Sequence, residues 1–259
     1  MAGHNRWSKV KHRKAVVDKR KGKALTMCSR AITVAVRASG PDPEFNFALR
    51  QALDEARYCN VPRDNIERAI KKGAGGGEGD DYQNVRYEGY GPAGVAVVID
   101  ALTNNRPRTA GDLRLILGKF GGNLGATGCV SFMFSVLGRI LVPATACDED
   151  RLFTLAAEAG ADDVKFEPDD PDDDAPDAQG EFVVLTPIDK MQHARATLEA
   201  AGFKVTHSRI TPIPTTLAHV AGDAAKQLLA LIDALDDNDD VQHVYANADI
   251  PDALLAELD

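Results

Sequence analysis

The sequence has 259 residues, of which 44% are hydrophobic and 27% charged, and its formal net charge is −9. At roughly 100–200 residues per domain, this length predicts two or three domains with sizeable cores. The apolar runs are far shorter than the ~20 residues that a membrane helix needs, so we expect no membrane association. No apolar signal-peptide core follows the basic N-terminus, and the four cysteines form no Cys-x-x-Cys pair. We therefore expect a cytoplasmic protein whose cysteines are small buried side chains.

The first 23 residues are strongly basic. They hold nine Lys and Arg and a single acid, which gives a local formal charge of +8 and leaves −17 for the rest of the chain. They also hold the only tryptophan, Trp7, and two histidines, His4 and His12. Such asymmetry predicts a polyanionic partner. An aromatic ring among basic residues can stack on a base while the cations neutralise phosphates.

Residues 1–14 lack apolar periodicity and are predicted to be a flexible arm. From residue 15 onwards apolar side chains recur every three or four residues, which predicts a helix that ends at the Ser39-Gly40-Pro41 sequence. Further helices are predicted over residues 43–59 and 62–73. Residues 1–75 are thus expected to form a basic helical domain, followed by a glycine-rich linker.

After the linker, segments with the alternating hydrophobic pattern of strands are interspersed with segments that have the period of amphipathic helices. Strands are predicted over residues 85–87, 95–99, 130–137, 138–143, 164–167, 182–185, 203–210 and 241–245. Helices are predicted over residues 109–120, 152–159, 190–201, 223–235 and 252–258, with Asp148 as the N-cap of the second.

The order of these elements predicts an α+β, multidomain fold. Residues 138–213 follow the β-α-β-β-α-β order of a ferredoxin-like domain. Residues 82–137 lack a closing helix and strand, which residues 214–259 supply. We therefore expect the N-terminal helical domain plus two α+β domains, with residues 138–213 inserted in a domain made of residues 82–137 and 214–259. The acidic stretch at residues 168–180 has too little apolar content to fold alone, and would serve solubility, repel nucleic acid from the wrong face or compete for the basic arm.

Motifs for catalysis or cofactor binding are weak in this sequence. Residues 89–94 match G-x-G-x-x-G, but a predicted strand follows where a dinucleotide site needs a helix, so the pattern favours a hairpin turn. The acidic run at residues 236–240 lacks the ligand spacing of a calcium loop, which favours a solvated turn. We therefore expect a protein that is not an enzyme and that has no metal, no cofactor and no small-molecule substrate.

Arg106 and Arg108 form a second, weaker positive site. They flank Pro107 at the start of a predicted helix, where backbone N–H groups also favour anions. Together with the N-terminal residues they make up the predicted nucleic-acid-binding set, which is Arg6, Trp7, Lys9, Lys11, His12, Arg13, Lys14, Lys19, Arg20, Lys21, Lys23, Arg106 and Arg108.

Several motifs resemble those of the YebC/PmpR family. The resemblance begins with MAGHNRW and VKHRK at residues 1–7 and 10–14, and continues with NVPRDNIERAIKKG at residues 60–73. It extends through YEGYGP, NRPRT and GGNLG, which start at residues 87, 105 and 121, to the Ile213-Pro214 pair. The family includes the mitochondrial translational activator of cytochrome oxidase.

The resemblance implies a helical domain and two α+β domains, one inserted in the other, in a cytoplasmic protein without catalytic activity. Family members are usually described as transcriptional regulators that bind promoter DNA. Others are linked to translation, in which they bind the ribosome and ease synthesis of difficult stretches such as proline runs. We therefore expect a monomeric nucleic-acid-binding regulator whose target is promoter DNA or ribosomal RNA. The alternative from another class is a protein-interaction scaffold whose basic arm docks on an acidic protein.

Overall fold

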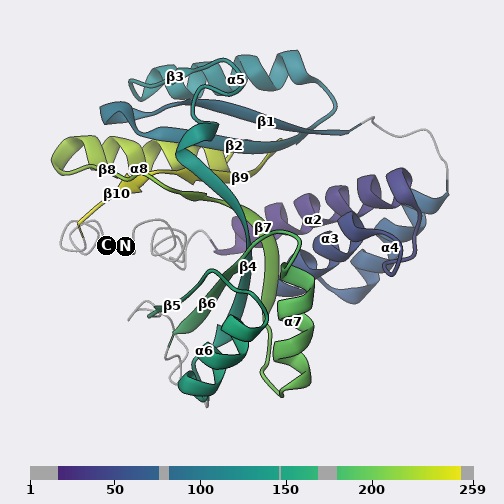
Figure 1. Cartoon of the computed structure of the whole chain (residues 1–259). Coiled ribbons are helices and arrows are strands. Elements are labelled where there is room, and N and C mark those ends of the chain that lie inside the picture. The colour runs from purple at the N-terminus through teal and green to yellow at the C-terminus, as the bar shows by residue number, and fades with distance from the viewer. Residues whose placement is uncertain (1–16, 76–81, 146, 169–179, 252–259) are drawn as a thin grey trace.

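The computed structural model describes residues 17–75, 82–145, 147–168 and 180–251, with side chains from Gly22 onwards. It is a mixed α and β structure, as the sequence predicts. Three helices come first: α2 (Val17–Ser39), α3 (Phe47–Tyr58) and α4 (Arg63–Ala74). Ile32, Leu49 and Ala56 are fully buried between them and form the centre of a small helical core (Figure 1).

Helix α3 begins four residues later than the sequence predicts. The cause is Asn46, whose buried side chain caps the helix by accepting a hydrogen bond from the Leu49 N–H over 3.0 Å. The amide of Asn46 also donates to Ala35 O over 2.7 Å and to Gly40 O over 2.8 Å. One side chain therefore ends the loop, starts α3 and ties both to α2.

The first sheet has the strand order β3-β1-β2-β9 and is antiparallel throughout. Its strands are β1 (Gln83–Tyr90), β2 (Ala96–Thr103), β3 (Asn123–Leu124) and β9 (Val241–Ala246). The helices α5 (Arg106–Lys119) and α8 (Gly222–Asp236) pack on it through a buried core that includes Ile99, Leu113 and Leu231. A short parallel pair, β8 (Ala218–His219) and β10 (Ala248–Asp249), lies beside this core. The C-terminal segment thus completes the sheet that residues 83–124 begin.

The second sheet has the order β5-β6-β4-β7 and is also antiparallel. Its strands are β4 (Phe134–Pro143), β5 (Asp163–Glu167), β6 (Glu181–Thr186) and β7 (His207–Pro214). The helices α6 (Glu149–Glu158) and α7 (Met191–Ala200) cover one face, where Ile140, Leu152 and Leu198 are fully buried. Asp148 caps α6, as the sequence predicts. This β-α-β-β-α-β arrangement and strand order are ferredoxin-like.

The sequence predicts that one strand ends at residue 137 and that the next begins at residue 138. That strand break is not present in the structure. Residues 131–133 form a short 3-10 turn, η2 (Ser131–Met133), and β4 then runs without interruption from Phe134. Gly138 does not end a strand. A Cβ atom there would lie 2.7 Å from Met191 Cβ, so glycine allows α7 to approach the sheet closely.

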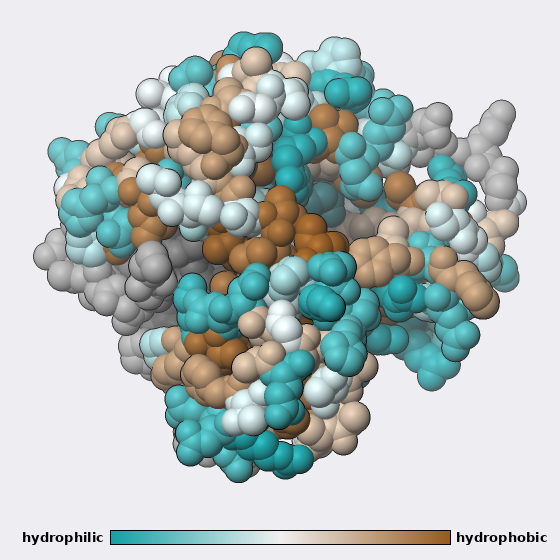
Figure 2. Space-filling view, viewed as in Figure 1, coloured by the Kyte–Doolittle hydropathy of each residue, from teal (hydrophilic) through white to brown (hydrophobic). Residues whose placement is uncertain are grey.

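Strand β7 also differs from its predicted range of 203–210, since it extends to Pro214 and pairs with β4 as far as Phe134. Prolines are tolerated there because β7 is an edge strand. Figure 1 shows β4 and β7 reaching from the second sheet towards the first. Figure 2 shows hydrophobic surface gathered in the same central region. The predicted division into domains at residues 75, 137 and 213 stays a prediction.

Candidate nucleic-acid interface

The structure describes the predicted nucleic-acid-binding residues to different extents. Lys19, Arg20 and Lys21 lie in the first turns of α2, where the backbone alone is described. Lys23, Arg106 and Arg108 are described with their side chains. The remaining predicted residues lie outside the described part of the chain, and they are Arg6, Trp7, Lys9, Lys11, His12, Arg13 and Lys14.

Helix α2 is fastened to the turn between α8 and β9 by two cationic side chains. Lys23 Nζ donates to Asn238 O over 2.7 Å, and Arg30 Nη1 donates to the next carbonyl, Asp239 O, over 3.0 Å. Lys23 and Arg30 are about two helical turns apart and therefore lie on one face of α2. The guanidinium of Arg30 also lies 5.3 Å from the centre of the Tyr82 ring, a cation–π contact. The basic beginning of α2 is thus fixed beside residues 238 and 239.

Arg108 reaches the same turn from helix α5. Its Nη2 lies 2.8 Å from Asp240 Oδ2 in an ion pair. Cations from both predicted positive sites, the N-terminal stretch and the start of α5, therefore meet at three consecutive residues, Asn238, Asp239 and Asp240. The sequence predicts the two positive sites separately and gives no indication that they are neighbours.

Asp240 anchors Arg108 at this turn, a role that the sequence does not predict. The sequence predicts a solvated turn at residues 236–240, yet Asp240 is buried, so that prediction is wrong for this residue. Its Oδ2 accepts hydrogen bonds from Thr109 Oγ1 over 2.7 Å and from Thr103 Oγ1 over 3.3 Å, besides the bond from Arg108. Burial opposes ionisation, but the hydrogen bonds from Arg108 and Thr109 outweigh it and hold the pKa of Asp240 below its ordinary value. One feature of the sequence could have predicted this burial, since Asp240 directly precedes the apolar strand β9.

The start of α5 offers less to an anion than the sequence predicts. Asn105 is the N-cap and accepts from the Arg108 N–H over 3.1 Å, while its carbonyl accepts from the Thr109 N–H. Pro107 has no N–H to offer. The Arg106 side chain is exposed, and the Tyr87 hydroxyl donates to its carbonyl oxygen over 3.1 Å. At this helix start the side chain of Arg106 is therefore the group best placed to meet a phosphate.

A second carboxylate, Glu88 on β1, organises the glycine-rich loop that follows β3. It is buried and accepts hydrogen bonds from the N–H groups of Gly128, Val130 and Ser131, each over 2.9 Å. Burial raises the pKa of Glu88, and these three backbone donors lower it further than burial raises it. The loop therefore takes its order from one side chain about 40 residues earlier, which no local motif indicates.

The G-x-G-x-x-G match at residues 89–94 is a hairpin turn, as predicted. It joins the antiparallel strands β1 and β2 through the 3-10 turn η1 (Pro92–Gly94), in which Ala93 has a φ of 56°. Within the ranges given above for the structure, no three His, Cys, Asp or Glu residues come together in a way that could hold a metal ion. In those same ranges, no helix combines the length and the apolar character that crossing a membrane requires.

Comparison with known proteins identifies the family. The model described as "TACO1/YebC protein N-terminal domain" matches residues 5–76, and that described as "TACO1/YebC second and third domain" matches residues 82–248. The chain belongs to the TACO1/YebC family.

Relatives in this family match the chain over nearly its whole length. A "Probable transcriptional regulatory protein" of Sulfurihydrogenibium sp. is 45% identical to this chain, and the match covers 100% of both sequences. Another of the same name, from Acidithiobacillus ferrooxidans, is 47% identical over 100% of this chain and 99% of its own. Among solved structures, the conserved hypothetical protein Aq1575 from Aquifex aeolicus matches with a TM-score of 0.81 and 40% identity, covering 96% of this chain and 98% of that one.

Proposed function

We propose that this TACO1/YebC protein is a non-enzymatic regulator of gene expression that binds nucleic acid through its basic N-terminal stretch. The observation that carries the proposal is the meeting of α2 and α5 at residues 238–240, through Lys23, Arg30 and Arg108. This arrangement puts Arg106 and the basic start of α2 on the same part of the molecule. The names of the relatives make transcription the first process to test, with promoter DNA as the target.

The N-terminal stretch supplies affinity through charge. Residues 2–14 alone contain five Lys and Arg. Each phosphate that such a side chain neutralises releases about 0.9 counterion from duplex DNA and about 0.7 from a single strand. Trp7 adds a ring that can stack on a base or wedge between two. The rest of the chain, with a formal charge of −17, repels nucleic acid from its other faces and so orients the complex.

In this proposal the rest of the chain orients the basic N-terminal stretch and contacts other molecules. The helical domain of residues 1–75 carries the binding stretch. The α+β domain of residues 82–137 and 214–259 supplies Arg106 and the turn that anchors α2, and residues 138–213 form the inserted ferredoxin-like domain. The protein works as a cytoplasmic monomer, with no cofactor.

Ribosomal RNA is a second candidate target, and the described part of α2 favours it. Lys23 and Arg30 are engaged with the turn at residues 238–239, and Ile32 is buried against α3 and α4. While they hold this turn, Lys23 and Arg30 are not available to read base edges in the major groove as side chains of a recognition helix do. Phosphate contacts with a folded RNA need no recognition helix. In this case the protein is a ribosome-associated translation factor that relieves stalling on difficult sequences such as proline runs.

Deletion of residues 2–14 from the otherwise complete chain tests the proposal. We expect affinity for a labelled DNA duplex and for a ribosomal RNA fragment to fall at least tenfold at low salt, and the slope of log K against log salt to become shallower. Fluorescence anisotropy over a salt series measures both quantities. Unchanged affinity and slope would contradict the proposal. Trp7→Ala should weaken binding while leaving the melting temperature unchanged.

Crosslinking in cells, followed by sequencing of the bound nucleic acid, separates the two targets. Enrichment of promoter fragments supports the transcriptional role, and enrichment of ribosomal RNA supports the role in translation. A pull-down with and without nuclease treatment tests the scaffold alternative. Partners that survive nuclease treatment and require the arm would show that it docks on protein instead.

A further inference from the structure

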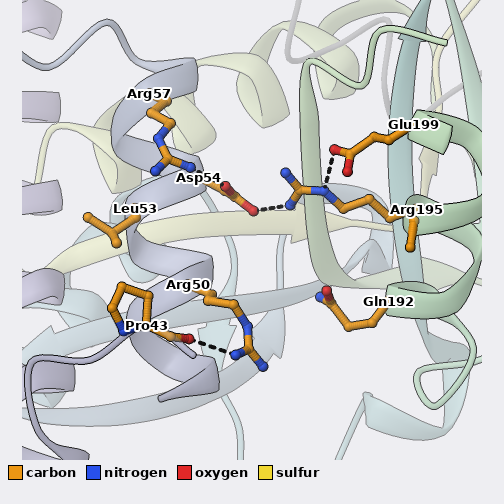
Figure 3. A pocket seen from close by; sticks show the side chains of 9 residues that line it. Pro43, Arg50, Leu53, Asp54, Arg57, Gln192, Arg195 and Glu199 are labelled. Atoms are coloured by element: carbon orange, nitrogen blue, oxygen red, sulfur yellow. Dashed lines mark hydrogen bonds and ion pairs between the residues drawn. The ribbon is translucent and has the colours of Figure 1, made fainter. Parts of the chain in front are cut away.

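A cleft of about 300 Å³ lies between helix α3 and helix α7. Figure 3 shows side chains from the two helices facing one another across it. Three arginines, two carboxylates and an amide supply its polar lining, and these are Arg50, Arg57, Arg195, Asp54, Glu199 and Gln192. The ionised groups leave the cleft with one net positive charge.

The two carboxylates are already neutralised by two of the arginines. Asp54 forms ion pairs with Arg57, at 3.0 Å, and with Arg195 across the cleft. Arg195 also pairs with Glu199 at 2.9 Å. This chain of ion pairs, drawn in Figure 3, joins α3 to α7 and sets the width of the cleft. It leaves the charge of Arg50 uncompensated.

Arg50 is held in place by backbone and not by an acid. Its Nη1 donates to Pro43 O over 2.6 Å and to Glu44 O over 2.7 Å. No carboxylate pairs with it in the part of the chain that the structure describes, and within that part its buried Nε lacks a hydrogen-bond acceptor. Because Nη1 is taken up by the two carbonyls and Nε is buried, Nη2 is the group that remains to donate, and it carries the positive charge that a phosphate needs.

An exposed aromatic side chain, Phe45, belongs to the same loop as the carbonyls that hold Arg50. It is 84% exposed, although a phenylalanine normally gains by burial. The loop is rigid, because Asp42 accepts from the Glu44 N–H and Asn46 ties the loop to α2. Phe45 therefore presents its ring to solvent from an anchored loop, two residues after Pro43, which lines the cleft. The Arg50 guanidinium also lies 5.7 Å from the centre of the neighbouring Phe47 ring.

We propose that this cleft binds a single strand of nucleic acid, with a phosphate at Arg50, the Gln192 amide as a further donor and an unpaired base stacked on Phe45. The inference rests on the proposed function, and assigns to it a second contact site in addition to the N-terminal stretch. A duplex does not expose base faces, so the aromatic platform selects single strands. An acidic peptide would use the arginine but has no group that needs the exposed ring.

Full-length variants and a labelled single-stranded oligouridylate of about 12 nucleotides provide the test, because single-strand sites cover roughly 4–16 nucleotides. We expect Phe45→Ala to raise the Kd about 5- to 20-fold by removing one stacking contact. Arg50→Gln should raise it by a similar factor and make the salt slope shallower by about 0.7. Both variants should bind a matched RNA duplex within about twofold of the parent.

Two matched controls lie elsewhere on the surface. Phe132→Ala removes a ring that is 72% exposed, and Arg63→Gln removes an exposed arginine at the start of α4. Each should leave single-strand binding within about twofold, since neither residue lines the cleft or belongs to the loop that holds Arg50. Circular dichroism melting confirms that every variant is folded.

The outcomes separate this inference from the function on which it rests. If deletion of residues 2–14 weakens binding but Phe45→Ala and Arg50→Gln do not, the cleft is not a contact site, while the proposed function stands. If neither the deletion nor the cleft variants change binding, both ideas are wrong. If an oligoglutamate displaces the RNA and its binding depends on Arg50 but not on Phe45, the cleft is a site for acidic peptides and the inference is overturned.

Discussion

Glu55 on α3 accepts a hydrogen bond from His207 on β7, with 2.9 Å between Oε2 and Nε2. The ring of Tyr58 stacks on His207 with the two ring centres 4.4 Å apart. Arg209 approaches the same carboxylate to 4.0 Å and also donates to His243 Nδ1 on β9 over 3.2 Å. A single carboxylate thus joins the N-terminal helices to the second sheet and, through Arg209, to the first. Burial raises its pKa, but the His207 hydrogen bond and the nearby cations hold the pKa of Glu55 well below its ordinary value.

Glu55→Gln should lower the free energy of unfolding by about 1–3 kcal/mol, because His207 then loses its charged acceptor and Arg209 its ion-pair partner in a largely buried place. Urea unfolding followed by circular dichroism measures the change. The matched control is Glu67→Gln. Glu67 is paired with Arg63 on the surface, and loss of that pair should change stability by less than about 0.5 kcal/mol. If the two substitutions lower the free energy of unfolding equally, the Glu55 contacts contribute no more to stability than an exposed ion pair does.

The environment of His243 predicts that the protein loses stability in mildly acidic solution. Burial, with Arg209 close by, lowers the pKa of His243 from 6.5 to about 4, so the folded state favours the neutral ring, which accepts from Arg209. The contribution of this group is therefore complete above pH 6.5 and is lost as the pH falls towards 4. At pH 4 the loss amounts to roughly 3 kcal/mol. Glu55 does not titrate in this window, because its own pKa is lowered.

Denaturant unfolding at several pH values between 7 and 4 checks this expectation. In His243→Gln the decline between pH 6.5 and 4 should be smaller than in the parent, since no ring remains to be protonated. His193→Gln, which alters an exposed histidine, should keep the decline of the parent protein. If the His243 variant declines as steeply as the parent, other groups are responsible.

Local signals predict much of the fold, because the forces that start and stop helices act over a few residues. The end of α2 at Ser39 and the cap at Asp148 follow from neighbouring residues alone. The continuity of β4 does not, since the reason for Gly138 is its contact with Met191, 53 positions later. Judged from its sequence neighbours alone, a glycine predicts the end of a strand. A glycine that lies under a packed helix instead allows the helix to approach the sheet closely.

The candidate sites were predictable in part, for a similar reason. The charge of the N-terminal stretch is a local property, so composition shows it directly. The burial of Asp240 depends on Arg108 and Thr109, which precede it by 132 and 131 residues. The cleft beside Arg50 depends on Arg195, paired with Asp54 over a separation of 141 residues. No periodicity or motif within one segment could bring these side chains together.

Asp240→Asn should lower the free energy of unfolding by about 1–2 kcal/mol, because a neutral amide keeps the shape but loses the ion pair with Arg108. Asp239→Asn is the matched control, since the Asp239 side chain is exposed and its carbonyl, not its carboxylate, holds Arg30. Thermal unfolding of both variants gives the comparison. A double-mutant cycle with Arg108→Gln isolates the pair, and a coupling energy near zero would contradict its role as an anchor.

Glu88→Gln should loosen the glycine-rich loop as well as lower overall stability. The carboxylate accepts from three backbone N–H groups through both oxygens, whereas a glutamine presents one oxygen and one NH₂ group, so at least one of Gly128, Val130 and Ser131 loses its acceptor. We expect a loss of about 1–3 kcal/mol and faster hydrogen exchange at these three amides. Glu158→Gln, on the exposed side of α6, should change neither quantity. If the three amides exchange at the parent rate in Glu88→Gln, the loop is ordered by its own backbone, and the carboxylate merely fills a place that an amide can also fill.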